Sequence, residues 1–406
     1  MAFAYRHQPV KALFLALGTL SLLARLPFYL LRNLFPSWRP RRSWTLSRTV
    51  LVKLIEETTR IVLHTGLPEQ ESLEDLKKVW KERFVLIEPL EEKLIVGELR
   101  TYAEANRVKS ERVGGFWFEK DENARVGRKA GQDEKVIVVL HGGGFVLGSG
   151  TPSFFSNKEI CEGLLKHIPQ ISRIFAVEYR LASSAPYPVA NPFPTATLDC
   201  LAGYHYLVHQ VGFSSNNIIV AGDSAGGLLT YHLARYTAEC SNMARELPIP
   251  GGLLLLSPTL DHSFEPRGSM ITNLRSDYLS SWLEPGYSVR SILGFLPRIE
   301  LQGSWLSPGL SSLSNEERIK CSRFLRKFPK TLVVVGEAEM TKDPMKTFTD
   351  RLVENSGIES EKVDYLEVDN ALHDWIGMPD LGIGFMEPEK ATALKYIAGW
   401  VGELWS

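Results

Sequence analysis

The ten residues 218–227 read Ile-Ile-Val-Ala-Gly-Asp-Ser-Ala-Gly-Gly, and they decide the fold of this chain. The four apolar residues predict a buried strand. Gly222 to Gly226 then fits G-x-S-x-G, a sharp strand-to-helix turn that holds a serine hydroxyl clear of the sheet. Glycines allow dihedral angles that side chains would prevent. A helix over 228–237 should follow, and Ser224 is the predicted nucleophile.

About 80 residues earlier, the apolar run Val136–Leu140 leads into His141-Gly142-Gly143-Gly144-Phe145. An HGGG loop of this type supplies backbone N–H groups to the oxyanion of a reacting carbonyl. His141 is expected to brace the loop. By chance, G-x-S-x-G occurs in roughly one of ten chains of this length, and HGGG in about one of several hundred. The two motifs together therefore predict a serine hydrolase.

Further apolar runs alternate with helical segments along the rest of the chain. Near-continuous apolar strands separated by helices predict an α/β fold, with a mostly parallel sheet covered on both faces. Sites in such folds lie at the carboxyl ends of the strands. The predicted strands are 114–118, 174–177, 253–256, 332–335 and 363–368, and the predicted helices are 47–63, 70–83, 195–211 and 391–405.

The nucleophile needs a histidine base, and only three histidines follow Ser224. His232 lies two turns into the helix behind the serine and should point away from it. His262 falls in residues 258–310, an aromatic-rich insertion between two core strands. His373 follows the strand 363–368 by a short loop, at the edge where the site is expected. His373 is therefore the predicted base.

The acid that orients the base should follow the preceding strand, 332–335. The loop there contains three carboxylates, Glu337, Glu339 and Asp343. The order of the residues alone leaves all three open.

The motifs together resemble the hormone-sensitive-lipase-like family of α/β-hydrolases, particularly fungal members similar to steryl acetyl hydrolases. The resemblance covers roughly residues 110–400. It is carried by H-G-G-G, by Tyr179-Arg180-Leu181-Ala182 with Pro192, Pro194 and Asp199 downstream, by G-D-S-A-G-G, by the acid loop 336–343, and by His373-Asp374.

The resemblance implies an α/β-hydrolase fold with a helical cap and assigns roles to individual residues. Glu339 takes the position of the triad acid, where the family more often has Asp, so Asp343 and Glu337 stay as rivals. The implied oxyanion donors are the backbone N–H groups of Gly143, Gly144 and Ala225. The cap would recruit residues 47–85 and 258–310.

The N-terminus differs in composition from the rest of the 406-residue chain. The first 55 residues contain nine Lys and Arg and no acidic residue, so the remainder carries a net charge of −10. The overall charge of −1 argues against nucleic-acid binding. A basic, apolar N-terminus on an acidic body predicts contact with an anionic membrane surface.

The apolar stretch Ala12–Ala24 has Lys11 before it and Arg25 after it, and residues 12–31 are long enough to span a bilayer. We expect membrane association through residues 12–35, as a signal anchor or an interfacial helix. A buried cap helix and a cleaved signal peptide are the alternatives. The basic residues that follow predict a cytosolic body, for instance at the endoplasmic reticulum.

The sequence thus predicts a membrane-prone segment at 1–45, cap helices at 46–100 and a catalytic domain at 101–406 with a lid at 258–310. The expected reaction is hydrolysis of a short-acyl, acetyl-type ester of a hydrophobic alcohol such as a sterol or a secondary metabolite, with no metal or organic cofactor. A thioesterase, lactonase, amidase or formamidase would use the same triad. A binding protein is the other class, since plant gibberellin receptors resemble the family but lack the histidine.

No oligomeric state is indicated by the sequence. The four cysteines are expected to be free thiols in the core: Cys161, Cys200, Cys240 and Cys321.

Overall fold

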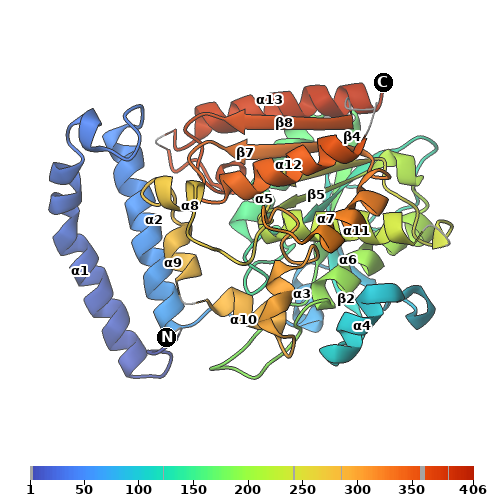
Figure 1. Ribbon diagram of the computed structural model, residues 1–406, viewed down its shortest axis with the longest axis horizontal. Helices are drawn as coiled ribbons and strands as arrows, with labels where there is room; N and C mark the ends of the chain where they lie inside the picture. Colours follow the sequence, from blue (N-terminus) through green and yellow to red (C-terminus); the bar gives the residue numbers. More distant parts are fainter. Residues whose placement is uncertain (1–2, 122, 241–242, 285, 357–361, 383) are drawn as a thin grey trace.

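A single eight-stranded sheet forms the centre of the molecule in the computed structural model, which describes residues 3–121, 123–240, 243–284, 286–356, 362–382 and 384–406 (Figure 1). The strand order is β1-β2-β4-β3-β5-β6-β7-β8. β1 pairs with β2 and β2 pairs with β4 in antiparallel fashion, whereas all the other neighbouring strands run parallel. The strands are β1 Phe84–Ile87, β2 Val113–Glu119, β3 Lys135–Leu140, β4 Ile171–Glu178, β5 Ile218–Asp223, β6 Gly252–Leu256, β7 Lys330–Gly336 and β8 Val363–Val368.

The register of the central strands brings the predicted motifs together. Leu140 at the end of β3 pairs with Gly222, and Asp223 pairs with Leu256 at the end of β6. Because these strands are parallel, their carboxyl ends meet at one edge. The HGGG loop and the serine turn therefore lie side by side at the centre of the sheet.

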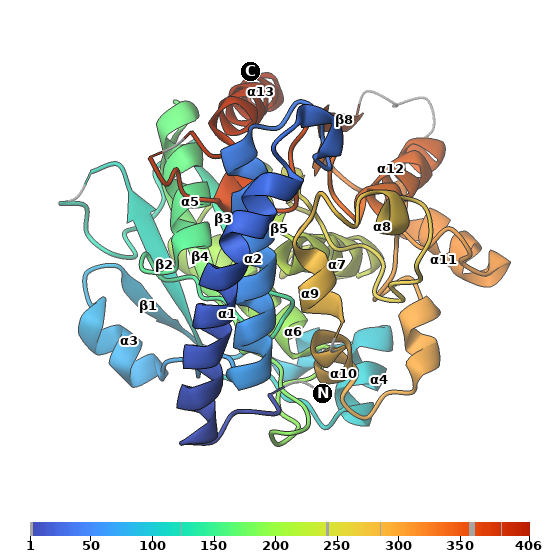
Figure 2. The same ribbon diagram turned by 90° about the vertical axis from the view of Figure 1, so that its left-hand side faces the viewer.

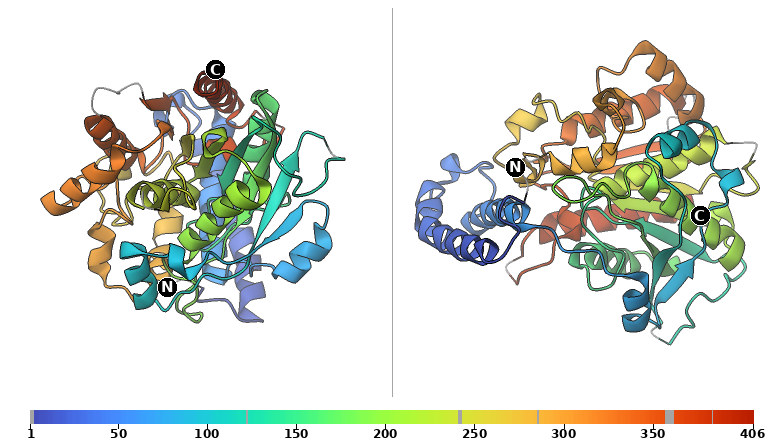
Figure 3. Two further views of the ribbon diagram at one scale, coloured as in Figure 1. Left: turned by 90° about the vertical axis from the view of Figure 1, so that its right-hand side faces the viewer. Right: turned by 90° about the horizontal axis from the view of Figure 1, so that it is seen from below.

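Helices cover both faces of the sheet, as the apolar strands predict (Figure 3). One face carries α5 and α13, and the other carries α6, α7, α11 and α12, each over its own apolar core. All four cysteines are free and buried, as predicted. These helices are α5 Phe155–His167, α6 Thr195–His205, α7 Ala225–Glu239, α11 Asn315–Leu325, α12 Lys342–Ser356 and α13 Glu387–Leu404.

Two predicted helices have different bounds in the structure. The helix predicted over 70–83 is only α3, Leu73–Val79, because the chain then turns into β1, where Phe84 pairs with Phe116. Among the elements that were not predicted from the sequence are β1, α4 (Gly97–Ala105), α5, α11 and α12. The helix predicted over 195–211 is α6 followed by a π-helical turn, Tyr206–Val211.

The N-terminus forms an antiparallel helical hairpin that stands beside the carboxyl edge of the sheet (Figure 2). Its helices are α1, Val10–Arg32, and α2, Leu46–Thr65. An ion pair of 3.1 Å joins Arg25 to Glu57 across the hairpin. By length and composition α1 is able to cross a membrane, yet it packs along α2.

The insertion between β6 and α11 forms short helices over the same edge of the sheet. In its described part it contains no strand, as predicted. α9 packs against α2, so the insertion and the hairpin meet above the serine turn. The short helices are α8 Ser269–Thr272, α9 Leu279–Leu283 and α10 Tyr287–Leu293, with a 3-10 turn over Arg298–Gln302; further 3-10 turns lie at Pro36–Trp38, Glu92–Leu94, Ser215–Asn217 and Trp375–Gly377.

Candidate active site

The serine turn has the strained backbone that its sequence predicts. Ser224 has φ 52° and ψ −114°, between the end of β5 and the start of α7. A Cβ on Gly222 would lie 2.1 Å from the carbonyl oxygen of Gly226, and a Cβ on Gly226 would lie 1.9 Å from that of Leu140. Both glycines are therefore required by the close approach of backbone segments, and the turn presents the serine hydroxyl at the edge of the sheet.

A continuous hydrogen-bonded chain joins the serine to a histidine and a carboxylate. Ser224 Oγ lies 2.8 Å from His373 Nε2, and His373 Nδ1 lies 3.0 Å from Glu339 Oε2. All three side chains are buried. They come from β5, the loop after β8 and the loop after β7, so the order of strands in the sheet brings together residues that are 149 and 34 positions apart. This arrangement has the geometry of a nucleophile, a base and an orienting acid.

Glu339 is held by donors on both carboxylate oxygens. Its Oε1 accepts from the Gly336 N–H at 2.6 Å and from the Ser257 hydroxyl at 2.7 Å, while Oε2 faces His373. Burial raises the pKa of Glu339, and the bonds from Gly336 and Ser257 limit that rise to a pKa of about 8. These two donors therefore favour the ionised form of Glu339.

The two rival carboxylates are engaged elsewhere. Glu337 pairs with Arg41 at 2.6 Å, and Asp343 accepts from the Ser269 N–H at 2.8 Å. Only Glu339, of the three, contacts His373 in the described part of the chain.

The HGGG loop faces the serine with free backbone donors. Gly143 and Gly144 have φ of 104° and 59°, and a Cβ on Gly143 would lie 2.1 Å from the Leu147 carbonyl oxygen. Within the described residues, no hydrogen bond engages the N–H groups of Gly143, Gly144 or Ala225. Three donors are thus available beside Ser224 for an oxyanion.

His141 braces this loop from beneath. Its ring stacks on Tyr179 with centroids 4.0 Å apart, and the Tyr179 hydroxyl donates to the His141 carbonyl at 2.6 Å. Burial lowers the pKa of His141 to about 4, which keeps the ring neutral. This matches the bracing role expected of His141.

Three further carboxyl groups, those of Asp223, Asp277 and Asp374, lie near the Ser224–His373 pair, and the sequence alone indicated no role for them. Asp374 Oδ2 lies 3.3 Å from His373 Nε2, on the side of the serine. Burial raises the pKa of Asp374 and raises those of Asp223 and Asp277 to about 7. Asp223 and Asp374 adjoin Ser224 and His373 in sequence, which is a signal that could have found them. Asp277 comes from the insertion and had no such signal.

The other two late histidines are buried and hydrogen-bonded to groups other than Ser224. His232 bonds to Thr197 at 2.9 Å and to the Trp305 carbonyl at 2.7 Å, and His262 bonds to the Leu306 carbonyl at 2.8 Å. Burial lowers their pKa values to about 3 and about 4, so both are neutral.

A cavity of about 560 Å³ lies above Ser224 and His373. Its walls are largely apolar and include four parts of the chain: α2 of the hairpin, α9 of the insertion, the start of α5, and the loop before α13. The cavity has the size and character of a pocket for a hydrophobic small molecule. Apolar lining residues include Leu51, Leu54, Ile55 and Val62 of α2, Leu279 and Trp282 of α9, and Phe155, Met378, Leu381 and Phe385.

No group of three potential metal ligands occurs at this site within the described residues. Such a group, His205 with His209 and Glu246, lies at the opposite edge of the sheet and is considered below.

Comparison with known families matches residues 137–377 to a family described as alpha/beta hydrolase fold. The chain belongs to this family. The match includes the HGGG loop, the serine turn, the acid loop and His373, which are the elements that the site is built from.

The relatives of this chain include proteins that are named as enzymes. An ethyl acetate hydrolase of Pseudomonas putida is 34% identical over 132 residues, which cover 31% of this chain and 36% of the relative. A tuliposide A-converting enzyme of Tulipa gesneriana is 25% identical over 260 residues, covering 59% of this chain and 58% of the relative. The chain thus spans less than two thirds of either relative.

The solved structure of a hormone-sensitive lipase from a metagenome library has the same fold. It is 25% identical, with a TM-score of 0.50 and coverage of 72% of this chain and 82% of that one. The expected α/β-hydrolase fold and the hormone-sensitive-lipase-like resemblance are therefore confirmed.

Proposed function

We propose that this protein is a carboxylic ester hydrolase that works through an acyl-enzyme on Ser224. One observation carries the proposal: Ser224, His373 and Glu339 form a hydrogen-bonded chain at the floor of an apolar cavity. Relatives named as an ethyl acetate hydrolase and an acetyl-hydrolase support the reaction class.

In the proposed reaction the Ser224 hydroxyl attacks the ester carbonyl while His373 Nε2 takes its proton. His373 then protonates the departing alkoxide, and Glu339 stabilises the imidazolium between these steps. The N–H groups of Gly143, Gly144 and Ala225 bind the oxyanion, each worth about 3 kcal/mol to the transition state. A water molecule, activated by His373, hydrolyses the acyl-enzyme and releases the acid.

The substrate we propose is a short-acyl, acetyl-type ester of a hydrophobic alcohol, of which a sterol or an apolar secondary metabolite is an example. The apolar walls of the cavity favour a hydrophobic alcohol. In this proposal the hairpin and the insertion 258–310 act as a cap, because α2 and α9 both line the cavity.

The test is hydrolysis of nitrophenyl esters from acetyl to dodecanoyl by the full chain in detergent, with Ser224→Ala as the matched variant. We expect a maximum at acetyl or butyryl and a loss of about 10⁶ in kcat for Ser224→Ala. A maximum at dodecanoyl would contradict the short acyl group. Turnover that persists in Ser224→Ala would contradict the mechanism.

We further propose that α1 lies along a membrane surface rather than crossing it. Both ends of α1 are fixed to the same body. Near its start, Phe3 is fully buried against Tyr187 and Tyr287, with ring centroids 5.4 and 4.6 Å apart. Beyond its end, the Trp44 indole donates to the Asn370 carbonyl at 3.0 Å. A spanning helix would need its ends on opposite sides of the bilayer.

The outer face of α1 has the composition of an interfacial helix. Its leucines are exposed although the helix is apolar, and no acid accompanies the basic residues of this segment. Such a helix buries its apolar face in the acyl boundary and attracts anionic lipids. Exposed apolar residues on this segment include Leu13, Leu17, Leu20, Leu23, Leu31, Phe28, Phe35 and Trp38.

Co-sedimentation with vesicles tests this face. We expect the Leu17→Ser, Leu20→Ser double variant to bind phosphatidylserine-containing vesicles at least tenfold more weakly, with unchanged hydrolysis of a water-soluble acetate ester. Ile319→Ser removes an equally exposed apolar side chain on α11 and serves as the control. Equal vesicle binding by all three proteins would contradict the proposal.

A further inference from the structure

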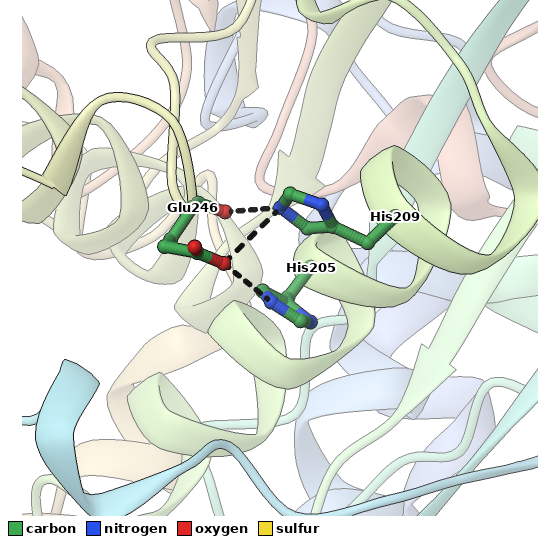
Figure 4. A group of neighbouring side chains, drawn as sticks. All are labelled: His205, His209 and Glu246. Atoms are coloured by element: carbon green, nitrogen blue, oxygen red, sulfur yellow. Dashed lines mark hydrogen bonds and ion pairs between the residues drawn. The ribbon is translucent and has the colours of Figure 1, made fainter.

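Two histidines and a glutamate meet at the amino ends of the central strands, away from Ser224 (Figure 4). His205 ends α6, His209 lies in the π-helical turn that follows, and Glu246 lies in the segment before β6. We propose that this cluster binds a divalent transition-metal ion, with Zn²⁺ as the preferred metal. This binding is independent of the proposed esterase reaction.

The donor atoms are close to the spacing that one ion requires. Glu246 Oε2 lies 3.7 Å from His205 Nε2 and 3.9 Å from His209 Nε2. The three ligand atoms lie within 4.8 Å of one another. Ligands of a tetrahedral zinc ion at its usual bond lengths are about 3.3 Å apart, so each imidazole nitrogen would have to move about half an ångström closer to the Glu246 carboxylate for the site to close. The Glu246 backbone carbonyl oxygen, 2.8 Å from His209 Nε2, is a fourth candidate ligand atom at the same place.

The backbone presents both imidazoles on one side of the helix. The two histidines are four positions apart, and their ring centroids are 4.3 Å apart. π-helical turns are rare and are frequent at functional sites. In the sticks of Figure 4 both rings face the Glu246 side chain, each from its own turn of the chain. Two imidazoles and a carboxylate converging in this way form a donor set that suits zinc.

One donor atom lacks the partner that its position calls for. His205 Nε2 is shielded from solvent, and no described residue gives it a hydrogen bond. A shielded and unbonded imidazole nitrogen facing a carboxylate is satisfied by a cation between them.

The location indicates a structural role for the ion. The Tyr204 hydroxyl already donates to the Pro248 carbonyl at 2.9 Å, joining the end of α6 to the segment that leads into β6. A metal held by His205, His209 and Glu246 would add a second tie between the same two segments. Because these segments lie at the edge opposite Ser224, we expect stabilisation of the fold without a change in turnover.

Titration calorimetry of the metal-free full chain with ZnCl₂, followed by thermal unfolding with and without zinc, tests the site. We expect one saturable site and a rise of Tm with zinc concentration. His205→Asn, His209→Asn and Glu246→Gln should each weaken binding at least tenfold. His167→Asn, which removes a half-buried histidine from α5, should leave it unchanged.

Several outcomes would overturn the site. The proposed site is excluded if the wild type shows no saturable zinc binding. It is also excluded if all three ligand variants bind zinc as the wild type does. Binding that is lost only in His373→Ala would place zinc beside Ser224 instead. Glu246→Gln changes a half-exposed side chain, so it keeps the test decisive if a histidine variant fails to fold. Because the esterase assay is separate, failure of either proposal leaves the other standing.

Discussion

The serine turn and the N-terminal hairpin border the same cavity, yet they are specified in different ways. At the turn, backbone atoms of β3, β5 and α7 approach so closely that single residue types are required, as at Gly222 and Gly226. In the hairpin, α1 touches α2 through side-chain ends and exposes its outer leucines. Close backbone contact requires one residue type at a position, whereas contact through flexible side chains requires only an apolar residue of suitable size.

The largest effect is expected beside the serine turn, in the acid loop that holds Glu339. Glu339→Gln keeps the shape of the side chain but removes the charge opposite His373 Nδ1, so we expect kcat to fall by about 10⁴. Steady-state kinetics with nitrophenyl acetate measures this. Glu337→Gln, two residues away, should change kcat less than about threefold, since Glu337 pairs with Arg41. A large loss in Glu337→Gln with full activity in Glu339→Gln would reverse the assignment.

Two glycine substitutions compare the regions directly. In Gly226→Ala the new Cβ would lie 1.9 Å from the Leu140 carbonyl oxygen, so we expect the free energy of unfolding to fall by more than about 3 kcal/mol. In Gly18→Ala of α1 the nearest atom is the end of the Ile61 side chain at 3.2 Å. The gain in helix propensity should keep that change within about 1 kcal/mol. Urea unfolding of both variants measures the difference, and equal losses would refute it.

The pH dependence of stability should have opposite signs at Asp277, beside His373, and at Glu57 in the hairpin. Beside His373, burial raises the pKa of Asp277 from 3.8 to about 7, so the folded protein retains a proton that the unfolded chain releases. Asp277 therefore reduces the free energy of unfolding as pH rises from about 4 to 7. Relative to wild type, Asp277→Asn should gain stability over this window in urea titrations. The exposed Asp369→Asn should show no such trend, and a matching trend there would contradict the account.

Glu57 in the hairpin should show the opposite sign and the smallest effect. Burial alone would raise the pKa of Glu57, but Lys53 and Arg25 together lower it below 4.5. This acid therefore stabilises the fold above pH 4.5 and loses that contribution as pH falls through its lowered pKa. Glu57→Gln should cost stability at pH 7 and little at pH 3. An equal cost at both pH values would show that the ion pairs are not the cause.

The sequence by itself determined the α/β class, the serine turn, the glycine loop and the choice of His373. Each follows from local rules: apolar runs set the strands, glycines mark close backbone approach, and the position of a histidine after a strand places it at the edge of the sheet. It also indicated that the N-terminus is basic and apolar, because composition needs no tertiary information.

The family resemblance favoured Glu339 but left Glu337 and Asp343 as rivals, and only the tertiary structure shows that Glu339 is the carboxylate that meets the imidazole. It also placed Asp277 of the insertion beside His373, and it brought His205 and His209 to Glu246. For α1, length and composition permit a membrane span, whereas the burial of Phe3 and the Trp44 hydrogen bond fix both helix ends to one body. These outcomes depend on contacts between residues distant in the chain, which no local pattern encodes.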